Sequence, residues 1–220
     1  MAARTHGENS SFWTRLQQAI GLVPLSLYAL QHLWRNWPAL DSREAWLLRA
    51  RSSSVEVSLG VCVIVLMAVH VILGVLRLLR ARANGASPQD QGRSRFQAVT
   101  GSVLLVFVVY HVVQVWPAAG TAAHAAAVDG YQRLWQLAGR PIPLVFYVLG
   151  IGALAFHLAH GWARWLEEHA AASVRVSMRY AAGLAGVLLF VLYLQLVGRF
   201  ALGEPVVPVG RAEAQEAVPQ

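Results

Sequence analysis

Five long apolar stretches limit the fold of this chain more than any other feature. They cover residues 16–37, 57–79, 97–116, 142–166 and 180–202. Each is close to the roughly 20 residues that an α-helix needs to cross the hydrocarbon core of a bilayer. Because that core offers no hydrogen-bond partner to the backbone, such stretches are expected to be helical. The sequence therefore predicts an all-α integral membrane bundle of five transmembrane helices.

The composition supports a membrane protein and argues against nucleic-acid binding. Charged residues make up 13% of the chain and apolar residues 56%, which is far from the usual balance of a soluble protein. The net charge of +7 comes from arginine alone, and the arginines lie between the apolar stretches instead of forming one basic face. Cys62 is the single cysteine and no CxxCH motif is present. Any haem would therefore be held without a covalent link.

The bundle is expected to occupy residues 15–202, between a cytoplasmic segment at 1–14 and a disordered tail at 203–220. The tail contains three prolines and three glutamates, a composition typical of disorder. The loop at 77–95 carries five arginines, which favours a cytoplasmic position for it and for the N-terminus. The alanine-rich connection at 118–139 is expected to form a short helix on the outer membrane surface.

One histidine lies past the middle of each of the first four stretches: His32, His70, His111 and His157. Because consecutive spans cross a membrane in opposite directions, His32 and His111 should lie near the outer side. His70 and His157 should lie nearer the inner side, roughly 10 Å away along the membrane normal. Two stacked bis-histidine levels are the arrangement expected for two b haems inside a helical bundle.

Three alternative roles for these histidines fit the surrounding residues less well. A lone histidine in a span can simply hydrogen-bond to a neighbouring helix. A proton relay usually adds carboxylates within the membrane, whereas Glu56 lies only at the edge of a span. A zinc site lacks a thiol or carboxylate at either level. His160 is an alternative ligand to His157, and the depth of His157 in its span favours His157.

The surroundings of the histidines suit a bulky anionic ligand. Both inner histidines are followed by a glycine after four residues and an arginine after seven: Gly74 and Arg77 after His70, Gly161 and Arg164 after His157. The glycines would let a flat ring approach the helix, although they also serve ordinary packing. Arg77 and Arg164 are candidate partners for haem propionates, as Arg35 is for the outer haem. Interfacial anchoring explains these arginines equally well.

The fifth stretch has no histidine. Its small residues Ala182, Gly183 and Gly186 are expected to pack closely against the rest of the bundle.

With these residues in view, the chain resembles the cytochrome b subunits of succinate dehydrogenase and fumarate reductase, in the class with one five-span polypeptide and two haems. The segments that carry the resemblance are GLVPLSLYALQHL around His32, MAVHVILGV around His70, VTGSVLLVFVVYH ending at His111 and AFHLAHGW around His157. The resemblance implies that helices one and three ligate the distal haem iron through His32 and His111. It implies that helices two and four ligate the proximal haem iron through His70 and His157, the same pairing as the depths give.

The resemblance also implies partners and a location. A flavoprotein and an iron–sulfur subunit would dock on the cytoplasmic face of a bacterial inner membrane, and electrons would pass through the haems to a quinone, with menaquinone favoured. This chain alone would catalyse no dicarboxylate reaction, and the complex could form a homo-oligomer. Both working directions, succinate oxidation and fumarate reduction, stay open.

The chain departs from the family pattern at two positions. Gln17 stands where some relatives have a histidine, and Glu56 is offset by about one turn from a carboxylate that the family links to quinol chemistry. Glu56 is therefore only a candidate for the quinone site. Two rival functions remain: the di-haem cytochrome b of another quinone-linked enzyme, such as a hydrogenase or formate dehydrogenase, and a haem-free transporter or scaffold.

Overall fold

The computed structural model describes residues 2–49, 54–83, 88–115 and 123–203, and over these ranges the chain is helical with no strand. The elements in chain order are α1 (Ala2–Asn36), the short 3-10 helix η1 (Trp37–Leu40), α2 (Arg43–Arg49), α3 (Ser54–Ala83), α4 (Pro88–Val115), α5 (Ala123–Ala138), α6 (Pro141–His169) and α7 (Arg175–Leu202). The predicted disordered tail lies outside the described residues from 204 onward. The predicted all-α fold is confirmed for the described part of the chain.

Four helices of the described residues are long and apolar enough to cross a membrane. These segments are Ser58–Arg80, Arg95–Gln114, Pro141–His169 and Arg175–Leu202, and they coincide with four of the five predicted spans. Many of their large apolar side chains face outward, including Val65 at 56%, Ile72 at 59% and Leu184 at 71% exposure. Such continuous apolar surface is costly in water and suits a surrounding of lipid.

The first predicted span, 16–37, lies inside α1, which is helical throughout but is not among these four helices. Its stretch carries the polar side chains of Gln17, Gln18 and Gln31, and Pro24 lies within the helix. These residues dilute the apolar character that a spanning segment needs. The fifth crossing therefore stays a prediction.

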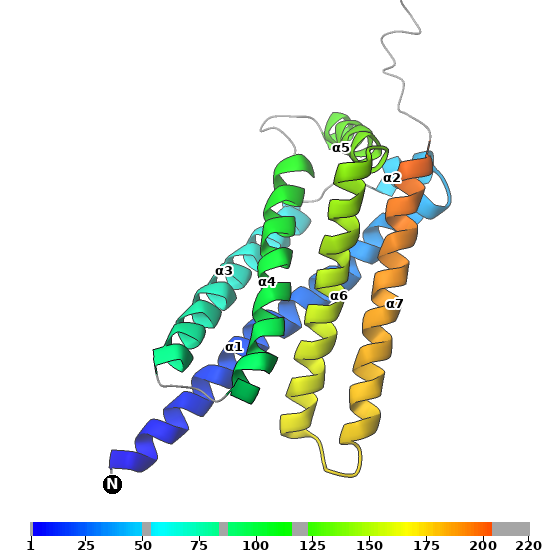
Figure 1. Cartoon of the computed structure of the whole chain (residues 1–220). Coiled ribbons are helices and arrows are strands. Elements are labelled where there is room, and N and C mark those ends of the chain that lie inside the picture. The colour runs from blue at the N-terminus through cyan, green and yellow to red at the C-terminus, as the bar shows by residue number, and fades with distance from the viewer. Residues whose placement is uncertain (1, 50–53, 84–87, 116–122, 204–220) are drawn as a thin grey trace, which may run out of the picture.

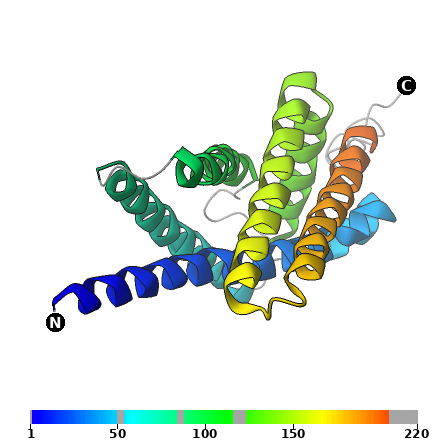
Figure 2. The same cartoon turned by 60° about the horizontal axis from the view of Figure 1, so that its bottom comes forward.

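The long helices alternate in direction, as expected for consecutive membrane crossings. In Figure 1, α1, α4 and α7 run from the bottom of the view to the top, and α3 and α6 run back down. Helix α1 is strongly tilted and crosses behind α4, α6 and α7, which Figure 2 shows from a second side. Residues past the middle of successive helices therefore alternate between the two ends of the bundle.

Helix α6 is the centre of the packing. It contacts α4 and α7 extensively and α1 to a smaller degree, whereas α3 packs mainly on α1. The main core joins α1, α4 and α6 through Leu22, Phe107, Tyr147, Ile151 and Leu154. The consecutive helices α3 and α4 make at most marginal contact. The bundle thus consists of two well-packed helix pairs, α1 with α3 and α4 with α6, and α7 covers α6.

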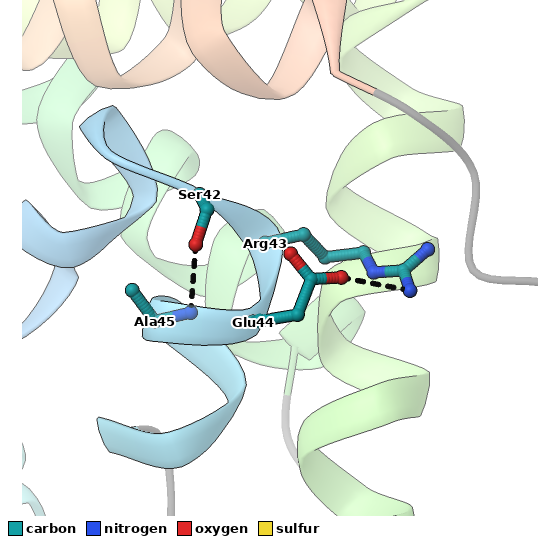
Figure 3. Close-up of polar contacts among 4 residues, drawn as sticks. All are labelled: Ser42, Arg43, Glu44 and Ala45. Atoms are coloured by element: carbon teal, nitrogen blue, oxygen red, sulfur yellow. Dashed lines mark hydrogen bonds and ion pairs between the residues drawn. The ribbon is translucent and has the colours of Figure 1, made fainter.

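A cap of short helices closes the upper end of the bundle in Figure 1. The rings of Trp46 in α2, Tyr131 in α5 and Phe200 in α7 pack together, with centroids 5.3–5.9 Å apart. The predicted short helix between residues 118 and 139 is confirmed as α5, whereas nothing in the sequence pattern indicated α2. Figure 3 shows how α2 begins, with the Ala45 backbone N–H donating to Ser42 Oγ at 3.0 Å and an Arg43–Glu44 ion pair beside it.

Helix α7 packs on α6 through small residues, as predicted, but only two of the three named positions take part. Ala182 and Gly186 are buried. A Cβ atom at Gly186 would lie 2.7 Å from Ala159 Cβ and 3.1 Å from the Ala155 carbonyl oxygen. The prediction for Gly183 was wrong, since a Cβ atom there would meet nothing within 4 Å. One residue along a helix turns the side chain by about 100°, which carries position 183 off the contact face.

This difference gives a matched pair of variants. Gly186→Val should lower the free energy of unfolding by about 1–3 kcal/mol relative to Gly183→Val, because only position 186 is overpacked. Both variants carry the same change in helix propensity, so the difference isolates packing. Thermal unfolding in detergent micelles measures it. Equal stability of the two variants would contradict the observed α6–α7 contact.

Candidate functional site

The structure brings the four predicted histidines together as two pairs. The ring centroids of His32 in α1 and His111 in α4 are 5.9 Å apart, with the ring planes at 90°. Those of His70 in α3 and His157 in α6 are 6.3 Å apart, with the planes at 85°. These are the two pairings that the span depths predicted. His157 therefore lies opposite His70, while His160 stacks on Phe156 of its own helix at 5.9 Å.

The spacing within each pair suits two axial ligands of one metal ion. A metal-bound imidazole nitrogen lies about 2 Å from the metal, and the ring centre lies roughly 1 Å behind it, so the centroids should be about 6 Å apart. The observed distances of 5.9 and 6.3 Å agree with this value. No group of three or more His, Cys, Asp or Glu side chains in the described residues could hold a metal by itself. Two facing histidines are a donor set that a haem would fit, because its porphyrin supplies four further nitrogens.

The proton on His70 is fixed by its neighbour on α1. His70 Nδ1 lies 2.9 Å from the backbone oxygen of Gln17. Because a carbonyl oxygen only accepts, Nδ1 carries the proton and Nε2 keeps its lone pair. Metal-binding histidines commonly donate their second nitrogen in this way, which fixes both tautomer and ring orientation. The Gln17 carbonyl therefore prepares His70 to ligate through Nε2.

His157 has the same tautomer for a different reason. Thr100 Oγ1 donates its hydrogen to the Phe96 carbonyl oxygen at 2.9 Å, so it accepts from His157 Nδ1, 3.2 Å away. The Gln97 amide nitrogen lies 3.2 Å from His157 Nε2 and donates to its lone pair. Ligation of a metal by His157 Nε2 would require this amide to shift to another acceptor. The His157 carbonyl oxygen is 3.3 Å from it already.

Aromatic side chains surround the outer pair. His111 Nδ1 lies 3.1 Å from the Tyr147 hydroxyl, and the His32 ring stacks with Tyr28 at 5.6 Å and Tyr193 at 6.4 Å. The Tyr193 hydroxyl in turn donates to the Ala29 carbonyl oxygen at 2.7 Å. Sequence reasoning missed Tyr147 and Tyr193, because a tyrosine in an apolar span has no signature that separates a site residue from an interfacial anchor.

Two glycines that sequence reasoning also missed lie against the inner pair. A Cβ atom at Gly21 would overlap the His70 ring, and one at Gly101 would lie 3.1 Å from His157 Cε1. The glycines that were predicted to give room face other side chains. A Cβ atom at Gly74 would lie 3.0 Å from Gln17 Nε2, and one at Gly161 would lie 3.0 Å from Leu22 Cδ1. The two glycines that approach the inner imidazoles lie on the helix packed against each histidine, α1 for His70 and α4 for His157.

The predicted propionate partners have other neighbours in the structure. Arg77 is exposed and donates to Gln17 Oε1 at 2.7 Å, with Arg164 and Glu168 within electrostatic range of it. Arg35 lies within electrostatic range of His32. The side chain of Glu56 lies outside the described residues. The roles assigned to Arg35, Arg77, Arg164 and Glu56 therefore stay predictions.

An antiparallel bundle of apolar helices with two facing imidazole pairs is the architecture of membrane-embedded b-type cytochromes. The chain is similar to the succinate dehydrogenase cytochrome b558 subunit of Bacillus subtilis (strain 168), with 27% identity over 161 residues, which cover 70% of this chain and 78% of that protein. This similarity confirms the resemblance to the succinate dehydrogenase cytochrome b subunits. No family model matches the sequence, and no solved structure matches it.

The hydrogen bond of His111 can be tested apart from any cofactor. Tyr147→Phe should lower the free energy of unfolding by about 0.5–1.5 kcal/mol, since it leaves His111 Nδ1 without its partner. Tyr110→Phe is the matched control, because the Tyr110 ring lies in the same cluster, 6.4 Å from that of Tyr147. Denaturation in detergent micelles compares them. A loss as large in the Tyr110 variant would show that the bond to His111 is not what Tyr147 contributes.

Proposed function

We propose that the chain is the membrane-anchor cytochrome b subunit of a bacterial succinate:quinone oxidoreductase, a succinate dehydrogenase or fumarate reductase. The observation that carries this proposal is the meeting of His32 with His111 and of His70 with His157 at the spacing of axial ligands. The similarity to a succinate dehydrogenase cytochrome b558 subunit supports the particular complex. The outward apolar surface of the long helices supports a place in the membrane.

Two b haems are the proposed cofactors, the distal one between His32 and His111 and the proximal one between His70 and His157. A haem with two imidazole ligands supplies one-electron transfer and leaves no open position for oxygen. The chain's own residues fix the geometry of the ligands. The Gln17 carbonyl and Thr100 Oγ1 hold the protons of the inner histidines on Nδ1, and Tyr147 orients His111.

The arginines are proposed to bind the acidic groups of these haems. Arg77 and Arg164 lie about two turns past the inner histidines in sequence, and their charges would favour propionates at the proximal site. Arg35, near His32, would do the same at the distal site. Arg77 already donates to Gln17 Oε1, so it would have to share its five N–H groups between the two partners.

The topology and partners of the proposed subunit follow from the arginine distribution and the resemblance. Helix α1 would provide the fifth crossing, with the N-terminus in the cytoplasm beside the arginine-rich loop at 77–95. A flavoprotein and an iron–sulfur subunit would dock on this side, and haems held by the two histidine pairs would supply electron transfer toward membrane menaquinone. Glu56 remains the candidate residue for the quinone site.

Single histidine substitutions test the proposal. The purified wild-type subunit should contain two haems per chain, by haem extraction and reduced-minus-oxidised spectra. His70→Ala and His157→Ala should lose the same haem, and His32→Ala and His111→Ala the other, because a haem with one axial ligand removed is no longer bis-histidine coordinated. Redox titration identifies which haem remains.

His160→Ala is the matched control, since His160 lies one turn from His157 on the same helix and its variant should retain both haems. A wild-type protein without haem would overturn the proposed function. Loss of both haems, or of neither, in all four ligand variants would overturn the pairing.

A further inference from the structure

The helix pairs α1–α3 and α4–α6 carry the same set of polar and small residues at the same spacing. On the first helix of each pair a glutamine precedes a glycine by four residues: Gln17 and Gly21 on α1, Gln97 and Gly101 on α4. On the second helix a histidine is followed by a glycine after four residues and an arginine after seven: His70, Gly74 and Arg77 on α3, His157, Gly161 and Arg164 on α6.

The equivalent residues also make equivalent contacts. In the first pair, Gly21 lies so close to His70 that a Cβ atom would overlap the imidazole ring, and in the second pair a Cβ atom at Gly101 would lie 3.1 Å from His157 Cε1. Each glycine therefore clears the space that the facing imidazole occupies. The contact between glycine and imidazole thus occurs in both helix pairs, and in each it is made by the glycine that follows the glutamine.

The glutamines lie in corresponding places as well. Gln17 Nε2 lies 3.0 Å from a Cβ position at Gly74, and Gln97 Nε2 lies 3.9 Å from one at Gly161. Each glutamine also touches the histidine of the facing helix, Gln17 through its backbone oxygen on His70 Nδ1 and Gln97 through its side-chain amide on His157 Nε2. Each amide thus lies beside the glycine one turn beyond the histidine, while the same residue contacts the histidine itself.

Close approach of a glycine to a ring also occurs in ordinary packing, since a Cβ atom at Gly150 on α6 would overlap the Phe107 ring. Other glycines of the long helices are open, since a Cβ atom at Gly60 on α3 or at Gly183 or Gly198 on α7 would meet nothing within 4 Å. Gly186, a packing glycine, meets a backbone oxygen and the Cβ of an alanine. Gly21 and Gly101 instead meet imidazole rings, and both rings belong to the inner pair.

We propose that the two helix pairs are copies of one structural unit, in which a Gln-x3-Gly helix forms a seat for the histidine of a His-x3-Gly-x2-Arg helix. Gln17, Gly21, Gln97 and Gly101 are then positioning residues for the axial ligands of the proximal haem. The inference rests on the proposed function for the haem, whereas the equivalence of the two units rests on the sequence and contacts alone.

The repeated unit also explains why there are two histidine pairs. His32 follows Gly21 by 11 residues on α1, and His111 follows Gly101 by 10 residues on α4. The outer pair thus combines the first helices of the two units, and the inner pair combines the second helices. The inner pair takes the same position from each copy, whereas the positions of the outer histidines differ by one residue.

Alanine substitution of the two seat glycines tests the inference in the haem-loaded complex. Gly21→Ala and Gly101→Ala should each weaken retention of the proximal haem about tenfold or more, as loss of a ligand's supporting contact usually does. The electron paramagnetic resonance signal and midpoint potential of that haem should shift, while those of the distal haem stay unchanged. Gly60→Ala and Gly183→Ala are the matched controls and should leave both haems unaltered.

Gln97→Leu provides a second measurement that adds no bulk at the seat. It removes the amide beside His157, whose contact to the His157 carbonyl oxygen at 3.3 Å would remain once Nε2 ligates iron, and it should shift the signal and potential of the proximal haem only. Gln17→Leu should shift them less, since Gln17 holds His70 through the backbone. This comparison holds even if a glycine variant fails to assemble.

The outcomes separate the inference from the proposed function. A wild-type protein without haem would overturn the proposed function. A wild-type protein with two haems, together with glycine and glutamine variants whose two haem signals are unchanged or equally changed, would overturn the seats alone. Lower thermal stability with intact haem signals would assign Gly21 and Gly101 to ordinary packing.

Discussion

An imidazole inside an apolar bundle must find partners for two ring nitrogens where little water reaches it, and this requirement organises the structure. Three of the four paired histidines have a protein partner at Nδ1: the Gln17 carbonyl, Thr100 Oγ1 and the Tyr147 hydroxyl. Each partner lies on a different helix from its histidine. The hydrogen bonds therefore fix ring orientation and the approach of two helices at once. The tautomer that they impose on the inner pair leaves the Nε2 atoms as electron-pair donors.

The helix arrangement follows from these approaches. Helix α3 has little other contact, since it packs mainly on α1 and turns most of its apolar surface outward. Its position thus depends on His70 meeting the Gln17 backbone and Gly21. Helix α4 is held on α6 both by His157 and by the Phe107–Tyr147 ring contact at 5.4 Å. Interiors between helices in lipid gain little from hydrophobic burial, so polar contacts and close backbone approach carry more of the specificity.

Hydropathy predicted the apolar part of each long helix, and alternation of direction predicted which histidines pair. The helices extend beyond the apolar stretches, since α1 begins at Ala2 and not at residue 16, and α4 begins at Pro88 and not at residue 97. Hydropathy could not predict how each helix is rotated about its own axis, because a lipid-facing side chain is as apolar as an interior one. That rotation separates Gly186, which faces α6, from Gly183, which faces outward. It also places Gly21 and Gly101 on the imidazoles and turns Arg77 toward Gln17. The short helix α2 was missed because residues 43–49 contain no long apolar run.

A repeated helix pair sets both the number of histidine pairs and the distance between them. One unit carries one histidine on each of its helices, so it could give an iron only one axial ligand at each depth. Two units that face each other supply both axial ligands at each of the two depths. Because Gly21 and Gly101 lie at the level of the inner imidazoles, the separation of the levels is the rise from each glycine to the next histidine on its helix, roughly 15 Å along the axis. This is longer than the roughly 10 Å expected from the span depths, and of the two helices only α1 is tilted strongly enough to shorten its component along the bundle (Figure 1). The spacing between the seat glycine and the outer histidine on one helix thus sets the separation of the two proposed haem sites.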